Sequence, residues 1–90
     1  MTKITLIVEN INGIHARPAA EIVKAVGEYS SCEVILEAKD GKTDAKSIMG
    51  ILMLKILHKT EVTITADGEG EDEVIAKIEK LFHDKFGFEE

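Results

Sequence analysis

Residues 61–66, Glu-Val-Thr-Ile-Thr-Ala, alternate between polar and apolar side chains. Successive side chains of a strand point to opposite faces, so this alternation predicts a β-strand with one buried face. Residues 2–8 and 32–37 alternate in the same way. The residues expected on the buried faces are Ile4, Leu6, Val8, Cys32, Val34, Leu36, Val62, Ile64 and Ala66. We interpret Cys32, the single cysteine, as a small buried hydrophobe rather than a reactive thiol.

Helical spacing of apolar residues predicts two helices, one between the first two strands and one from Glu71 onward. The apolar stripe of the first is formed by Ala19, Ile22, Val23 and Val26. The stripe of the second is formed by Val74, Ile78, Leu81 and Phe82. Both patterns match one face of an amphipathic helix. The second helix has acids in its first turn and lysines in later turns, the order that the helix dipole favours.

Two remaining segments complete the expected architecture. Asp40-Gly41 predicts a hairpin turn that leads into a short strand at residues 42–45. The apolar run from Ile48 to Leu57 predicts a further short helix, of which Ile51 and Leu54 pack on the sheet. The predicted order is strand, helix, strand, strand, helix, strand, helix. Three helices cover only one sheet face, so we expect an α/β (α+β) open-faced sandwich with a four-stranded, mostly antiparallel sheet.

The composition bounds the function. The chain has 90 residues, 17 acids, 11 bases and a net charge of -6. This size fits one domain spanning residues 1–90, with any site on the surface and no deep cofactor pocket. The acidic balance argues against nucleic acid as a partner. We expect no signal peptide and no membrane insertion, because the longest apolar stretch is too short to span a bilayer, and therefore a cytoplasmic protein.

The negative charge is concentrated near the end of the chain. Residues 67–90 hold nine acids and three lysines, whereas residues 1–66 hold eight acids and eight bases. We interpret the acidic tract as the solvated face of the last helix. No spacing of His, Cys or carboxylates suggests a metal site, and we expect His58 to be solvated.

The only arginine and the only proline lie together in Gly13-Ile14-His15-Ala16-Arg17-Pro18, directly before the first predicted helix. Pro18 suits a first helical turn, which places His15 at the helix N-terminus. The amides of the first turn form an anion site there, to which Arg17 can add a charge-assisted pair of hydrogen bonds. A neutral imidazole nitrogen can attack phosphorus, so this arrangement indicates a phosphohistidine. The alternative is that His15 only caps a helix.

In this segment and in a second one, the sequence resembles the HPr phosphocarrier family of the bacterial phosphoenolpyruvate-dependent sugar phosphotransferase system. Residues 12–20, Asn-Gly-Ile-His-Ala-Arg-Pro-Ala-Ala, resemble the family's active-site signature, and residues 45–51, Ala-Lys-Ser-Ile-Met-Gly-Ile, resemble its second signature. The interval from His15 to Ser47 is one residue longer than the commonest family pattern, with the extra residue expected near Asp40. The resemblance implies that Enzyme I phosphorylates His15 and that sugar-specific IIA domains remove the phosphoryl group. Arg17 and the backbone amides of Ala16 and Arg17 would bind it.

The resemblance also implies a surface for these partners. It includes an exposed apolar patch and two positions of the first helix, namely Ile48, Met49, Leu52, Ala20 and Lys24. Methionine suits such a surface because it is unbranched and adaptable. Glu21 and Gly27 stand where some members have neutral or basic side chains, which leaves the identity of the partners open.

Ser47 precedes the apolar run, so its expected structural role is that of a helix N-cap. In the family the equivalent serine can be phosphorylated by HPr kinase/phosphorylase. A phosphate there would place charge beside the docking patch and weaken partner binding. Unregulated members carry this serine too, so regulation remains open.

Three functions are therefore distinguished. The first is a phosphocarrier for sugar uptake, a monomer without a cofactor and not an enzyme in its own right. The second is a regulatory relative of the nitrogen-branch type, which acts through phosphorylation-dependent binding. The third is a binding module in which His15 is never modified.

Overall fold

The computed structural model describes residues 1–39, 41–84 and 86. Its elements follow the predicted order: β1 (Thr2–Ile7), α1 (Ala16–Gly27), β2 (Cys32–Ala38), β3 (Gly41–Asp44), α2 (Ile48–Met53), β4 (Glu61–Gly68) and α3 (Glu71–His83). Residue 40, where we expected the hairpin turn and the extra residue, lies outside the described residues, but β3 does pair with β2. The boundaries of the predicted strands differ from the observed ones by at most two residues.

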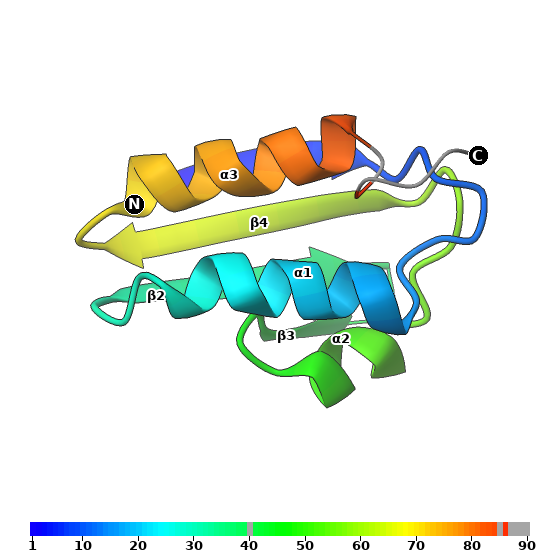
Figure 1. Ribbon diagram of the computed structural model, residues 1–90, viewed down its shortest axis with the longest axis horizontal. Coiled ribbons are helices and arrows are strands. Elements are labelled where there is room, and N and C mark those ends of the chain that lie inside the picture. Colours follow the sequence, from blue (N-terminus) through cyan, green and yellow to red (C-terminus); the bar gives the residue numbers. More distant parts are fainter. Residues whose placement is uncertain (40, 85, 87–90) are drawn as a thin grey trace.

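The four strands form one antiparallel sheet in the order β1-β4-β2-β3. Strand β4 is central, and its Ile64 is paired with Ile4 on one side and Leu36 on the other. Figure 1 shows α1 and α3 lying along the same face of this sheet, with α2 beside α1. The open-faced sandwich with three helices on one face is therefore confirmed.

The core lies between the sheet and the helices, where the two predicted patterns meet. Its fully buried side chains come from alternating strand positions and from the helix stripes, and include Val34, Leu36, Val62, Ile64, Ile22, Val26, Val74 and Ile78. Cys32 is buried as expected, and burial raises the pKa of its thiol. Ile51 and Leu54 also join the core, whereas His58 is exposed.

The start of α3 is more than a solvated acidic face. The Glu71 carboxylate lies 2.8 Å from the Met1 amine and accepts hydrogen bonds from the Thr2 hydroxyl (2.6 Å) and the Gly68 amide (3.2 Å). The charged amine, followed by the Thr2 hydroxyl and the Gly68 amide, lowers the pKa of Glu71 to about 2. These contacts tie edge strand β1 to the turn between β4 and α3.

The acidic residues near the end of the chain are only partly described, since residues 85 and 87–90 lie outside the described residues. Within the described part of the chain, no helix combines the length and apolar character that crossing a membrane requires.

Candidate functional site

The loop from β1 to α1 is fixed at Gly13. This residue has a φ of 69°, in the left-handed region that favours glycine. A Cβ atom here would lie 2.5 Å from the carbonyl oxygen of Ile56, so a side chain does not fit. The amide of Ile14 donates to that same carbonyl at 2.9 Å. The loop is therefore held against the segment between α2 and β4 immediately before the histidine.

His15 is the N-cap of α1. Its backbone is extended, with φ of −94° and ψ of −165°, and its carbonyl accepts the amide of Ala19 at 3.0 Å. The His15 side chain makes no capping hydrogen bond and is half-buried, while Ala16 and Arg17 are exposed. Pro18, which has no amide hydrogen, is buried in the first turn. The structure thus places the histidine and the arginine together at one helix start.

The electrostatics of this helix start favour an anion. The first turn of α1 contains no acidic residue. In any helix the first amides have no intrahelical acceptor, and the macrodipole adds positive potential there. Ala16 and Arg17 supply such amides, and the guanidinium of Arg17 adds a full positive charge. This is the chemistry that binds phosphate.

Ser47 is the N-cap of α2. Its Oγ accepts the amide of Gly50 at 3.0 Å, so it has the capping role expected from the sequence. Gly50 also permits a close approach of α2 to β3, because a Cβ atom there would lie 2.0 Å from Oγ1 of Thr43. Helix α2 also packs on α1, the helix whose N-cap is His15 (Figure 1). Ser47 and the apolar residues after it therefore belong to a helix that neighbours α1.

The apolar patch on α2 differs in part from the expectation. Ile48 and Met49 are exposed, at 41% and 69%. Leu52 is only partly exposed, because its side chain packs against the core. Met53, which we did not single out, is 73% exposed. It follows Met49 by four residues, the spacing that places two side chains on one helix face. Leu52 follows Ile48 at the same spacing, so this signal alone does not identify Met53.

Two further exposed apolar side chains lie beside the loop before α1. Ile11 is 61% exposed and Leu57 is 67% exposed. The Leu57 backbone lies against Gly13, since a Cβ atom on Gly13 would be 3.0 Å from its Cα. Sequence reasoning missed both, because only the folded chain brings residues 11–13 and 56–57 together.

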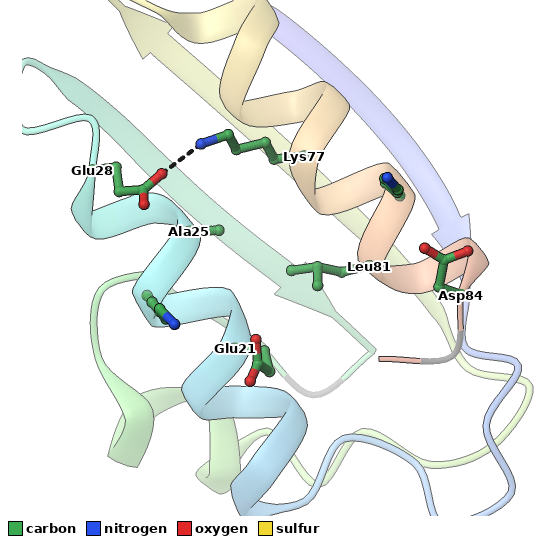
Figure 2. Close-up of a pocket in the computed structure, with 8 residues that line it drawn as sticks. Glu21, Ala25, Glu28, Lys77, Leu81 and Asp84 are labelled. Atoms are coloured by element: carbon green, nitrogen blue, oxygen red, sulfur yellow. Dashed lines mark hydrogen bonds and ion pairs between the residues drawn. The ribbon is translucent and has the colours of Figure 1, made fainter. Parts of the chain in front are cut away.

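Ala20 and Lys24 are on the exposed side of α1. Lys24 helps to line a groove of about 300 Å³ between α1 and α3 (Figure 2). Glu28 and Lys77 form an ion pair across it, which lowers the pKa of the carboxyl and raises that of the amine. The Lys77 Nζ also lies 5.1 Å from the centre of the Tyr29 ring. Since both signs of charge line this groove, we interpret it as a contact between the helices rather than an anion site.

In the parts of the chain that the structure describes, no three His, Cys, Asp or Glu side chains come together in a way that could hold a metal ion. The chemistry available at the start of α1 is that of an imidazole beside amides and a guanidinium.

The chain is similar to known proteins over most of its length. The family model described as "PTS HPr component phosphorylation site" matches residues 2–84. The HPr-like protein Crh of Bacillus subtilis is 44% identical over 66 residues, which cover 73% of this chain and 76% of that protein. The phosphocarrier protein HPr of Xylella fastidiosa is 35% identical over 81 residues, 90% of each chain.

Solved structures show the same fold. HPr from Thermoanaerobacter tengcongensis has a TM-score of 0.93 at 38% identity and covers 100% of both chains. A Bacillus subtilis Crh structure, described as a catabolite repression protein in a swapped dimer, has a TM-score of 0.72 at 35% identity. It covers 94% of this chain and 97% of that one. Fold, motifs and relatives agree, and the chain belongs to the HPr family of phosphocarriers of the phosphotransferase system.

Proposed function

We propose that this chain accepts a phosphoryl group on His15 from phosphorylated Enzyme I and passes it to IIA domains during sugar uptake. The observation that carries the proposal is the position of His15 at the start of a helix whose first turn holds no acid. Arg17, exposed in that first turn, is the phosphate-binding partner. A helix N-cap alone requires neither an arginine nor a turn without acids.

The transfer is a displacement at phosphorus. A neutral ring nitrogen of His15 attacks the phosphorus, and the N–P bond forms while the bond from phosphorus to the donor breaks, its electron pair leaving with the donor. The amides of Ala16 and Arg17 and the guanidinium of Arg17 stabilise the charge on the phosphoryl oxygens. The acceptor reverses the process, taking phosphorus as the N–P bond breaks. The chain is thus a carrier that serves partner enzymes.

The partners dock beside the histidine. Ile48, Met49 and Leu52 on α2 provide apolar area, and Ala20 and Lys24 extend the surface along α1. Burial of exposed methionine and isoleucine side chains favours association. The same surface must serve donor and acceptor in turn, so it must stay uncovered, which favours a monomer as the working form. The proposed exchange with Enzyme I places its work in the cytoplasm. The Crh relative is described as a dimer, so light scattering at assay concentrations tests this point.

The decisive experiment is incubation with phosphoenolpyruvate and Enzyme I, followed by analysis of the protein-bound phosphate. We expect an acid-labile label on the wild-type chain and none on His15→Ala. Absence of a label, or equal labelling of both, contradicts the carrier function. Transfer of the label to a purified IIA domain then tests the sugar branch.

A regulatory role is the second candidate, favoured by the 44% identity to Crh, whose structure is described as that of a catabolite repression protein. Phosphorylation of Ser47 by HPr kinase/phosphorylase would add nearly two negative charges directly before Ile48 and Met49. Partner binding would weaken as a result. ATP and this kinase should give an acid-stable phosphate that Ser47→Ala lacks.

A carrier of the nitrogen-branch type would instead accept the label on His15 without passing it to sugar-specific IIA domains.

A further inference from the structure

Asn10 is the one buried polar or charged side chain among the described residues, with none of its surface exposed. Its Nδ2 donates a hydrogen bond to the carbonyl oxygen of Gly13. Its Oδ1 is buried without a hydrogen-bond partner in the described part of the chain. A buried acceptor without a partner destabilises a fold. This cost offsets part of what the Nδ2 hydrogen bond contributes to stability, so the contact with Gly13 is the main structural effect of the carboxamide.

Asn10 holds both backbone groups of Gly13. The Gly13 amide donates to the backbone carbonyl of Asn10 at 3.0 Å, and the Gly13 carbonyl accepts Nδ2 of the same residue. The next residue, Ile14, is buried and is bonded through its amide to Ile56. His15 follows directly as the helix N-cap. A short chain of contacts thus leads from the Asn10 side chain to the backbone of the histidine.

We propose that Asn10 is a positioning residue for His15, acting through Gly13 to set the direction in which the chain enters α1. The inference rests on the proposed function, in which the imidazole must meet phosphorus in line with the leaving group. Transfer of this kind is sensitive to placement, and a shift of about 1 Å can cost on the order of 100-fold in rate. A loop held only by backbone contacts would leave the imidazole in a wider range of orientations.

The test compares Asn10→Ala with Val74→Ala, which removes buried volume from α3. Both are assayed as substrates of phosphorylated Enzyme I at a temperature where circular dichroism shows them folded. We expect Asn10→Ala to lower kcat at least about tenfold and leave KM unchanged, because the docking surface is intact. Val74→Ala should match the wild type in both constants.

Asn10→Asp adds a readout that a purely structural role would not change. A protonated carboxyl can still donate to the Gly13 carbonyl, whereas a carboxylate cannot and is repelled by it. We therefore expect transfer by Asn10→Asp to approach the wild-type rate at low pH and to fall as the pH rises, with a step that the wild type lacks. If Asn10→Ala fails to fold, this pH profile decides the proposal.

Equal transfer rates for Asn10→Ala and Val74→Ala, or a loss confined to KM, would overturn the inference. Failure of the proposed function has a separate signature, since the wild type would then carry no label at all. In that event hydrogen exchange of the backbone amides tests whether Asn10 holds the loop. Asn10→Ala should speed exchange of the Gly13 and Ile14 amides at least about tenfold relative to Val74→Ala, and unchanged exchange would refute the role of Asn10.

Discussion

Helices α1 and α3 lie on the same face of the sheet and begin at opposite ends of it (Figure 1), and their first turns have opposite charge. That of α3 contains Glu71, Asp72 and Glu73, whereas that of α1 contains no acid. Glu71 satisfies the Gly68 amide and binds the amine of Met1. A helix start that holds its own carboxylates serves as an anchor, and one that holds none is suited to an external anion.

The two starts also differ in how the chain reaches them. Before α3, Gly70 is itself the N-cap, with φ of 85°, and a Cβ atom there would meet the Tyr29 ring at 2.6 Å. Before α1, the left-handed glycine is Gly13, two residues ahead of the N-cap, and its neighbour is backbone. The approach to His15 is therefore the less adaptable of the two.

Of the substitutions considered, Gly13→Ala should lower the free energy of unfolding the most. Left-handed strain and overpacking against the Ile56 carbonyl together cost roughly 2–5 kcal/mol of unfolding free energy. Gly70→Ala should cost only roughly 1–2 kcal/mol, because the Tyr29 ring can turn aside. Urea denaturation of both variants measures the difference. Equal losses would mean that the two approaches are equally adaptable.

Ala16→Glu gives the start of α1 the charge that α3 already has. We expect it to stabilise the helix by about 0.3–1 kcal/mol at low salt. The same carboxylate should repel the incoming phosphoryl group and lower the transfer rate at least about tenfold. Ala16→Gln is the matched neutral control. If Ala16→Glu transfers as fast as this control, the absence of acids from the first turn of α1 has no functional meaning.

Both low and high pH should weaken the ion pair between Glu71 at the start of α3 and the Met1 amine. The pKa of Glu71 is lowered from 4.5 to about 2, so its contribution is complete above about pH 4.5 and is lost as the pH falls toward 2. The pKa of the Met1 amine is raised above 8.0 by Glu71, so its contribution is complete below that pH and is lost as the pH rises through the raised value.

Thermal unfolding from pH 2 to pH 10 measures this dependence. Glu71→Gln should have a lower midpoint near neutral pH and a flatter profile at both ends, with the rate of transfer to His15 unchanged. A variant whose profile has the same shape as that of the wild type would show that Glu71 is not the anchor.

Glu73→Gln should have the smallest effect. This exposed carboxylate lies in the first turn of α3, at the positive end of the macrodipole, and accepts a hydrogen bond from the Tyr29 hydroxyl at 3.3 Å. We expect a loss of about 0.3–1 kcal/mol at low salt. Screening should remove most of it at about 1 M salt, where the Debye length is about 3 Å. If the loss of stability does not depend on salt, its cause is the hydrogen bond from Tyr29 instead of the macrodipole.

Much of the fold could be predicted because the spacing of apolar residues in the sequence matches the side chains that are buried in the structure. Strand alternation at residues 2–8, 32–37 and 61–66 and the stripe from Val74 to Phe82 each specify one buried face. The order of the strands in the sheet did not follow from these local patterns, because pairing depends on contacts far apart in sequence. A candidate site could be named because its arginine and proline are unique in the chain, and the structure places both with His15 at the start of α1, as the sequence predicted.

Other features of the site could not be predicted. Nothing local distinguishes Asn10 from a solvated loop residue, and its burial follows from the packing of the whole loop. Leu52 and Met53 are neighbours of similar hydrophobicity, and only the rotation of α2 against β3 and α1 decides which one is exposed. The role of Glu71 was missed because it depends on Met1, which is distant in the sequence.

The central position of β4 constrains the order of events during synthesis. Strands β1 and β2 both pair with β4, and β4 is the last strand to leave the ribosome. Before then only the hairpin of β2 and β3 can form within the sheet, and the bond from Ile14 to Ile56 has no acceptor until residue 56 is made. These distant pairings predict slow folding for the chain's size. A nascent chain that stops before residue 56 would therefore carry all of residues 12–20 without the backbone contact that holds the approach to His15.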